Sequence, residues 1–388
     1  MNISESKGVV RQILGLETAP HLKASMTTQK IMLIVLLSLI PAFIVAIFYF
    51  GFGVFWQFVN CTVTALICEC FVCLLRRRNL LHYLSDLSYL VTAMILALTL
   101  PPLLPVYYSV IATVFAIIVV KAVFGGLGHN IFNPAMAAFI FLVISCPKIM
   151  GTTWVVPAPF AYGQASLSAT VDVIYKGEDP ENLKHLVEAL NLSDNSNDKE
   201  ELQQGQSILE KLDAITGATV LEKAKTSRKA KALNELTEAD FSSSQNQAYI
   251  ALAIAYLVGG LILIGCRILL FRMVFTFFTS FAVLAIVLHH FYPSVFYTFT
   301  ENLLYGGVIP CGFYIITDPD TNAGTAKGRI YFSILAAFLI AILRAFGAYS
   351  DTVAFALMPS NAWAPLIDVL THRRSFGIGY KKGDLKDA

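Results

Sequence analysis

Charged residues are scarce in this chain of 388 residues. Only 14% of the residues are Asp, Glu, Lys or Arg, whereas a soluble domain usually carries about 25%. The 28 Lys and Arg nearly balance the 26 Asp and Glu, so the strong basic charge of a nucleic-acid-binding protein is missing. Hydrophobic residues make up 56% of the chain, which excludes intrinsic disorder. The composition favours an integral membrane protein, because apolar runs of about 20 residues can cross a bilayer as helices.

The cysteines and glycines lack the patterns that bind metals, clusters or nucleotides. The seven cysteines are an odd number and lie mostly in apolar runs, so we expect no disulfide framework. Cys68 and Cys70 are two residues apart in a predicted helix and therefore point to different faces. With no histidine or second cysteine pair beside them, helix packing explains them better than a metal site. The chain also has no nucleotide-binding glycine fingerprint and no cluster-ligating cysteine set.

Ten apolar segments, several of them short, predict an all-α integral membrane protein. They are bounded by glycines, prolines and charged residues. The first five segments are residues 31–50, 54–75, 88–100, 107–122 and 133–149. The second five are residues 248–270, 273–291, 303–317, 330–346 and 352–370.

The distribution of Lys and Arg predicts the orientation of these segments, because cytoplasmic loops carry an excess of both. With the N-terminus inside, the inner connections and the C-terminal tail hold 13 of the 19 Lys and Arg that lie outside the polar segment 151–247, Lys121 among them. The short outer connections hold none, and Lys148 and Arg344 at outer helix ends are the exceptions. We therefore expect both termini in the cytoplasm.

A polar insertion separates the ten segments into two groups of five. It contains 15 acidic and 9 basic residues, and the topology places it outside. The third and eighth segments are short and end at Pro101 and Pro319, which indicates two inverted repeats with broken helices. The predicted divisions are a cytoplasmic arm (1–30), a first membrane repeat (31–150), the insertion (151–247), a second repeat (248–370) and a basic tail (371–388).

A glycine-rich segment, residues 125–136, precedes the fifth apolar segment. Its glycines permit turns that other residues resist, and Asn133 followed by Pro134 suits the start of a helix. If this helix start faces a membrane cavity, it can attract an anion or a polar head group. A loop that only turns the chain is an equal alternative. His129 has no partner ligands nearby, so we do not expect it to bind a metal.

Four acids lie within or beside apolar segments and are candidates for ion or proton passage: Glu69, Asp86, Asp318 and Asp368. Acids at membrane depth are costly and usually functional. Glu69 is the clearest buried acid. Asp318 begins a polar stretch that also fits a cap and turn. Asp86 and Asp368 lie near segment ends, where a solvated carboxylate is the competing interpretation.

The insertion contains a short stretch of small and hydroxyl-bearing residues, residues 213–219. Gly217 and Ala218 allow a bulky group to approach the backbone, and the hydroxyl of Thr219 can be esterified by a phosphate. Short patterns of common residues also occur by chance, and Thr219 with Glu222 fits a helix capping box. The residues alone leave both interpretations open.

Together these segments resemble the D-subunit family of Rnf (also called Rsx) electron-transport complexes. This family is related to the B subunit of the sodium-pumping NADH:quinone reductase. The resemblance covers nearly all predicted membrane segments, and the order and spacing of its parts make it specific. It is carried by residues 29–32, 100–102, 125–135, 317–319, 344–349 and 364–368.

The resemblance implies an FMN joined by a phosphoester to the last threonine of an Asp-Gly-x-Ser-(Gly/Gln)-Ala-Thr motif. That threonine corresponds to Thr219, and its neighbours in the motif are Thr216, Gly217 and Ala218. Thr216 is a conservative partner of the usual Ser. The implied role of these residues is cofactor binding, with no acid–base catalysis by this chain.

Two residues depart from that motif. Ala214 replaces the usual Gly, and Val220 replaces a common Pro. The acceptor and its small neighbours are intact, so the departures concern the geometry of the loop and the efficiency of flavin attachment. They leave open that the chain is a passive assembly subunit with a degenerate flavin site.

The resemblance further implies one subunit of a larger complex in the bacterial inner membrane. Electrons pass between reduced ferredoxin and NAD, coupled to Na⁺ or H⁺ movement, and partner subunits handle both redox substrates. Riboflavin is implied as a second, noncovalent flavin. Acids matching those implicated in ion uptake in the related reductase are Asp86, Asp318 and Asp368. The expected partners are the other subunits, the coupling ion and membrane lipid, with no nucleic acid.

A solute channel or secondary transporter is the competing function. Such proteins also use five-plus-five inverted repeats with broken helices, and fold alone does not fix function. Residues 213–219 distinguish the two possibilities, because a plain channel has no need of a flavin-attachment segment.

Overall fold

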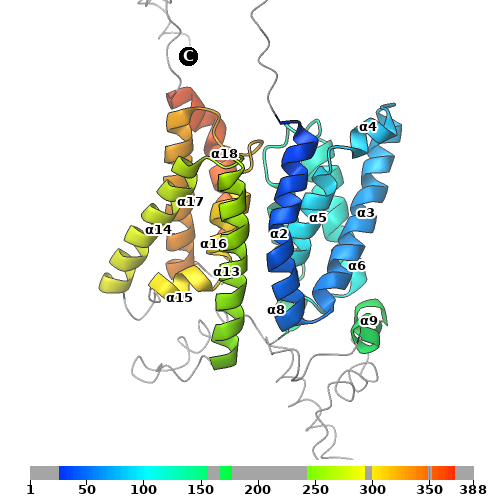
Figure 1. Ribbon diagram of the computed structural model, residues 1–388, viewed down its shortest axis with the longest axis horizontal. Helices are drawn as coiled ribbons and strands as arrows, with labels where there is room; N and C mark the ends of the chain where they lie inside the picture. Colours follow the sequence, from blue (N-terminus) through cyan, green and yellow to red (C-terminus); the bar gives the residue numbers. More distant parts are fainter. Residues whose placement is uncertain are drawn as a thin grey trace, which may run out of the picture.

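The computed structural model describes residues 26–155, 167–176, 243–292, 299–347, 349 and 352–371. Helices dominate these residues and form two groups that lie side by side (Figure 1). The N-terminal group, blue to cyan, comes from residues 26–155, and the C-terminal group, green to red, comes from residues 243–371. Helix α9 (Leu167–Lys176) lies at the end of the molecule opposite to α4 (Leu80–Leu84).

Two long helices and several shorter ones build the N-terminal group. The long helices are α2 (Thr28–Phe50) and α3 (Gly53–Leu75). The shorter ones after α4 are α5 (Ser88–Thr99), α6 (Val106–Val114), the π-helix η1 (Phe115–Ala122), α7 (Pro134–Ser145) and α8 (Pro147–Thr152). The helix α6 continues directly into η1, so the two form one apolar segment.

The C-terminal group has four long helices and one broken segment. The long helices are α13 (Ser243–Gly265), α14 (Phe271–Phe291), α17 (Ala326–Phe346) and α18 (Thr352–Thr371). The broken segment consists of α15 (Phe299–Leu304), α16 (Val308–Pro310) and the π-helix η3 (Cys311–Ile315). Three residues, 305–307, separate α15 from α16.

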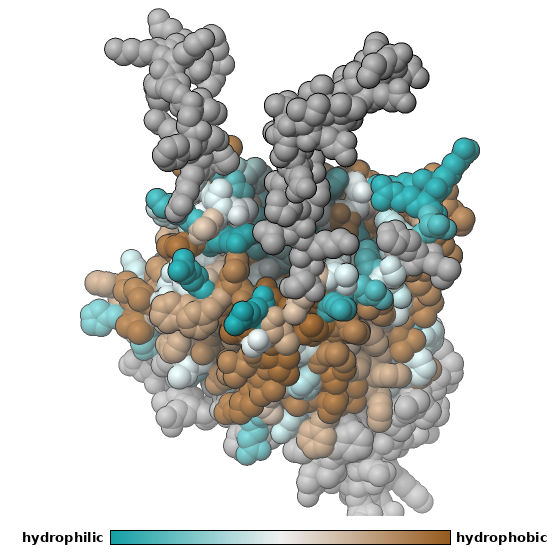
Figure 2. Space-filling model, turned by 45° about the horizontal axis from the view of Figure 1, so that its top comes forward, coloured by the Kyte–Doolittle hydropathy of each residue, from teal (hydrophilic) through white to brown (hydrophobic). Residues whose placement is uncertain are grey.

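Six helices are long and apolar enough to cross a membrane: α2, α3, α13 from Gln247, α14, α17 and α18. Three shorter apolar helices, Ser88–Thr99, Val106–Ala122 and Pro134–Ser145, accompany them. Hydrophobic residues (brown) cover the sides of the helices, and hydrophilic residues (teal) gather toward the upper end (Figure 2). So much exposed apolar surface suits a bilayer rather than water. The chain is a multi-pass membrane protein.

The predicted segments compare with the helices as follows. Helical residues occupy each of the ten segments, but the fifth is interrupted at Cys146, where α7 ends and α8 begins with Pro147. The eighth is broken between α15 and α16, in keeping with the expectation of broken helices. The ten-span topology, the inverted repeats and the positions of the termini stay predictions.

Capping side chains explain where several helices begin. The Asn133 side chain accepts hydrogen bonds from the backbone N–H groups of Ala135 and Met136, and Pro134 is the first residue of α7. This confirms the predicted helix start, because Pro lacks only an N–H that would have no helical partner. Thr325 caps α17 in the same manner through Gly328.

Small residues allow the two groups to approach closely. Helices α2 and α13 pack against each other across the interface. A Cβ atom at Gly259 of α13 would overlap the backbone oxygen of Ser38 in α2 and the hydroxyl of Tyr314. The same Tyr314 hydroxyl donates a 3.0 Å hydrogen bond to the Ser38 oxygen. The interface therefore depends on a backbone contact that tolerates no side chain at Gly259.

Candidate functional site

A polar cavity of about 590 Å³ lies where the two groups of helices meet. Hydrophilic and charged side chains line it from both groups. From the N-terminal group they are Ser88, Thr92, Lys121, Asn130 and Asn133. From the C-terminal group they are Arg267, Thr317, Asp318, Asp320, Asn322 and Arg329. The convergence of these charged and polar groups on one cavity between otherwise apolar helices marks it as the candidate site.

Asp318 follows η3 and meets the start of α7. Its carboxylate accepts a hydrogen bond from the Asn133 amide at 3.3 Å, which joins the two groups of helices. The Thr321 hydroxyl and the backbone N–H of Asp320 also donate to it, both at 3.3 Å. The side chain is half-buried and faces the cavity. Asp318 therefore holds the end of the broken segment while its carboxylate borders the polar space.

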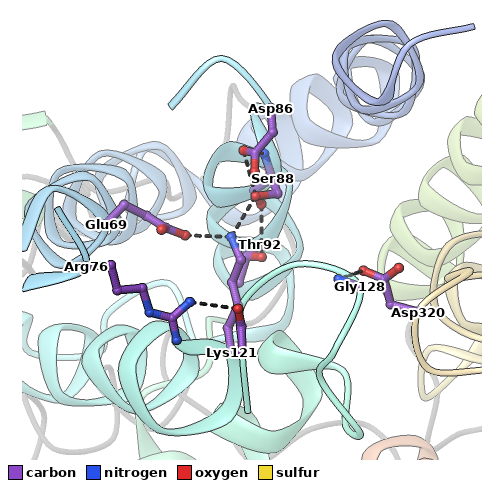
Figure 3. Close-up of polar contacts among 9 residues, drawn as sticks. Glu69, Arg76, Asp86, Ser88, Thr92, Lys121, Gly128 and Asp320 are labelled. Carbon is purple, nitrogen blue, oxygen red and sulfur yellow. Dashed lines mark hydrogen bonds and ion pairs between the residues drawn. The ribbon is translucent and has the colours of Figure 1, made fainter. Parts of the chain in front are cut away.

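The glycine-rich segment reaches across to the same loop. The backbone N–H of Gly128 donates a 3.0 Å hydrogen bond to the Asp320 carboxylate (Figure 3). Gly128 has a φ of 86°, a left-handed conformation that glycine adopts without strain. The sequence left open whether this segment binds an anion or only turns the chain. In the structure, the Gly128 N–H faces the Asp320 carboxylate, and the N–H groups of Ala135 and Met136 face the Asn133 side chain.

Glu69 and Lys121 form an ion pair inside the N-terminal group (Figure 3). The Lys121 ammonium lies 2.5 Å from the Glu69 carboxylate, and their side chains are only 4% and 3% exposed. The predicted burial of Glu69 is confirmed, and Lys121, which the sequence placed at the inner end of segment 107–122, is buried as its partner. Lys121 lies in η1, and the wide turn of such π-helical segments often occurs at functional sites.

Ser88 extends this ion pair toward Asp86. The Lys121 ammonium donates to the Ser88 hydroxyl at 2.7 Å, and the Ser88 hydroxyl donates to the Asp86 carboxylate at 2.8 Å. The Ser88 backbone N–H also donates to Asp86, at 3.0 Å. Asp86, predicted to lie near a segment end, is half-buried and caps the start of α5. Lys121 and Ser88 of this cavity wall thus form one continuous chain with Glu69 and Asp86.

Asp368 lies apart from this network. Its carboxylate accepts hydrogen bonds from the backbone N–H groups of Gly324 at 2.7 Å and Thr325 at 2.9 Å. Both donors belong to the turn that precedes α17. Among the four candidate acids, the structure therefore gives Asp368 a local role in holding this turn, and its role in ion passage stays a prediction.

Two arginines hold irregular backbone, Arg76 beside the glycine-rich segment and Arg344 at the break between α15 and α16. Arg76 at the end of α3 donates to the carbonyl oxygens of Ala122 and Gly125, the latter at 2.7 Å, and so fixes the start of the glycine-rich segment. Arg344 is buried and donates to carbonyl oxygens of Asn302 and Gly306 at the break between α15 and α16. The sequence had placed Arg344 only as an exceptional charge at an outer helix end.

The predicted flavin-attachment residues Thr216, Gly217, Ala218 and Thr219 lie outside the described residues. Sequence reasoning missed Lys121 and Ser88 as members of the site. A signal for Lys121 was present, because it is the single charge in the apolar run of residues 115–124. Ser88 follows Asp86 by two residues, a spacing typical of a side-chain cap.

Known proteins are similar to this chain along almost its full length. The sequence model of the NQR2, RnfD, RnfE family matches residues 16–377. A Shewanella frigidimarina protein, named as the D subunit of an ion-translocating oxidoreductase complex, is 34% identical over 362 residues, which cover 93% of this chain and 97% of that protein. Relatives with the same name from Aliivibrio salmonicida and Vibrio cholerae are also 34% identical, and the aligned regions cover 94% and 93% of this chain and 98% of each relative. The chain belongs to the NQR2, RnfD, RnfE family.

Proposed function

We propose that this protein is the D subunit of an ion-translocating oxidoreductase complex in the bacterial inner membrane. The observation that carries the proposal is the similarity to proteins of that name over at least 93% of the chain. The chain acts as one subunit and not as a complete enzyme. Partner subunits react with ferredoxin and NAD, while this subunit contributes a flavin and part of the ion pathway.

The polar cavity supports a role in ion movement. It offers carboxylate, amide and hydroxyl oxygens from Asp318, Asn133 and Thr317, and oxygen ligands of this kind suit hard cations and protons alike. The two groups of helices supply opposite walls of the cavity, so a change in their separation would alter its access. We assign this cavity as the vestibule for the coupling ion, Na⁺ or H⁺.

The flavin proposal rests on residues 213–219 and on family membership. Thr219 would carry FMN through a phosphoester, with Gly217 and Ala218 leaving room for the group. The flavin supplies the electron-transfer chemistry, and the protein supplies its position and surroundings. Riboflavin is the second proposed flavin and would bind without a covalent bond. The external side of the membrane is the proposed location of the insertion.

The detection of covalently bound flavin distinguishes this function from that of a plain channel or transporter. The chain is expressed with its native flavin-attachment machinery, separated on a denaturing gel, and examined for flavin fluorescence and for the mass of the modified peptide. The wild-type band should fluoresce, and Thr219→Val should abolish the fluorescence because the acceptor hydroxyl is lost. Thr226→Val, in the same insertion but outside residues 213–219, is the matched control and should retain it.

Acid precipitation of the assembled complex separates the two proposed flavins. FMN bound to Thr219 should stay in the protein pellet, whereas riboflavin should appear in the supernatant. A dark wild-type band, obtained with machinery shown to modify another target, would contradict the flavin role and favour a degenerate assembly subunit or a transporter.

A further inference from the structure

The chain of polar contacts beside the cavity has the geometry of a proton path. It runs from Glu69 through Lys121 and Ser88 to Asp86, with successive contacts of 2.5, 2.7 and 2.8 Å. Each distance lies within or just below the range of about 2.6–3.2 Å over which protons pass between positioned groups. The hydrogen bonds also share one direction, because Lys121 donates to Ser88 and Ser88 donates to Asp86.

We propose that Glu69, Lys121, Ser88 and Asp86 form a proton relay in which the Ser88 hydroxyl is the connecting group. The proposal rests on the proposed role in ion translocation and extends it to two residues, Lys121 and Ser88, and to one ion, H⁺. Glu69 is the interior end of the relay because its residue is only 2% exposed. Asp86 is the end that exchanges protons with water, because it is half-buried in the connection between α4 and α5.

One transfer moves a single proton and no electrons. An N–H bond of the Lys121 ammonium breaks as the proton passes to the Ser88 oxygen, while the Ser88 O–H proton passes to the Asp86 carboxylate. Lys121 and Asp86 both become neutral, and the Ser88 hydroxyl is regenerated. Asp86 then releases its proton to water, and Lys121 regains one from Glu69 when that carboxyl group is protonated. The same steps in reverse carry a proton inward.

The burial of Lys121 and Ser88, together with their access to the cavity, favours a proton relay over a purely structural contact. Lys121 and Ser88 are 3% and 4% exposed, yet both line the cavity of about 590 Å³. A buried lysine–glutamate pair stabilises a protein weakly at best, because desolvation offsets the attraction. Lys121 thus borders the cavity, and Ser88 connects it to Asp86.

Other titratable groups lie near these residues. Tyr83 of α4 forms a side-chain hydrogen bond with Glu69. The others are Arg76, Cys68, Cys70 and Tyr89. Asp318 and Asp320 face the same cavity from the C-terminal group.

The competing interpretation is structural. Asp86 would only cap α5, and Glu69 with Lys121 would only pack α3 against η1. Two substitutions separate these interpretations because each keeps the backbone contact between Ser88 and residue 86 and the Glu69–Lys121 ion pair. Ser88→Ala keeps the Ser88 backbone N–H bond to Asp86 and leaves the ion pair intact. Asp86→Asn keeps an oxygen that accepts from Ser88, but an amide cannot take up the proton.

The test uses the assembled complex in liposomes that contain a pH-sensitive dye. Reduced ferredoxin and NAD drive electron transfer in Na⁺-free buffer with a sodium ionophore, and NADH formation is recorded in parallel. Ser88→Ala and Asp86→Asn should each slow proton movement about tenfold or more, because proton transfer by positioned groups contributes rate factors of that size. Subunit composition and flavin content should match wild type.

Thr99→Val is the matched control, because Thr99 also lies on α5 but outside this cavity, and its hydroxyl donates to the backbone oxygens of Ile95 and Leu96. It should keep the wild-type rate of proton movement. Wild-type rates in Ser88→Ala and Asp86→Asn, or an equal loss in Thr99→Val, would overturn the relay. A wild-type complex that moves no H⁺ here but moves Na⁺ when the experiment is repeated in Na⁺ buffer without the ionophore would overturn the relay alone, whereas one that moves neither ion would overturn the proposed function as well.

Discussion

The charges of Glu69 and Lys121 depend on each other, because both side chains are almost completely buried. Removing one partner leaves the other charge without compensation, which costs about 3–5 kcal/mol for a buried pair. Lys121→Met should therefore lower the apparent melting temperature of the purified complex in detergent, measured by loss of the monodisperse peak on heating.

The double substitution Lys121→Met with Glu69→Gln is the control for that prediction. It removes both charges and should recover much of the lost stability, since a neutral pair carries no uncompensated charge. A single Lys121→Met variant as stable as wild type would show that Glu69 finds another cation or takes up a proton in place of its partner.

At the scale of single residues, the sequence predicted the acids better than their partners. The burial of Glu69 followed from its position within an apolar run. Its contact with Lys121 joins residues 52 positions apart, so helical periodicity gave no information about it. Counting Lys121 among the loop charges was reasonable for topology, but a lysine with a buried acid as its partner does not need to reach water.

At the scale of elements, the close contact between α2 and α13 requires a glycine at position 259. Gly259→Ala should destabilise the protein, because the added methyl group would overlap the Ser38 oxygen and the Tyr314 hydroxyl. Gly265→Ala in the same helix is the control, since no atom lies within 4 Å of its Cβ position. The measurement is thermal stability of the purified complex, and equal stability of the two variants would contradict the close approach.

Helix starts were more predictable than helix interruptions. Asn133 and Pro134 form a local signal that needs no tertiary information, and α7 begins there. Pro147 lay inside a predicted continuous segment, although it marks the first residue of α8. The apolar composition of residues 133–149 masked this break. The π-helical turns of η1 and η3 were not predicted from the sequence.

At the scale of the whole molecule, substitutions at Asp318 and Asp368 should distinguish an effect on ion transport from an effect on stability. Asp318→Asn should slow ion transport by the assembled complex more than it lowers flavin attachment, because the carboxylate borders the cavity but the asparagine can still accept hydrogen bonds. Ion movement into liposomes and fluorescence of the flavin-bearing band are the two measurements. Equal transport by mutant and wild type would remove Asp318 from the mechanism.

Asp368→Asn is the contrasting variant. Its carboxylate holds the turn before α17 through two backbone N–H groups, so its loss should reduce thermal stability rather than selectively slow transport. A selective loss of transport in Asp368→Asn would assign this acid to the ion pathway instead.

The global organisation was only partly accessible from the sequence. Composition predicted a helical membrane protein, and six helices of sufficient length bear this out. Apolar runs locate the helices but do not say which of them meet, so the cavity between Asn133 and Asp318, 185 residues apart, could not be foreseen. The arrangement of the termini and the flavin-bearing insertion stays a prediction.

Because η1 is a π-helix, the direction in which Lys121 points depends on the number of residues in this segment as well as on their identity. Each residue of an α-helix advances by about 100° around the axis, so deleting one residue between Phe115 and Lys121 would allow the wide turn to close into an α-helix. Lys121 would then face a different direction from Glu69, although both residues remain. An insertion or deletion in this stretch would therefore disconnect the ion pair without changing a single charge, and substitution data alone would miss this dependence.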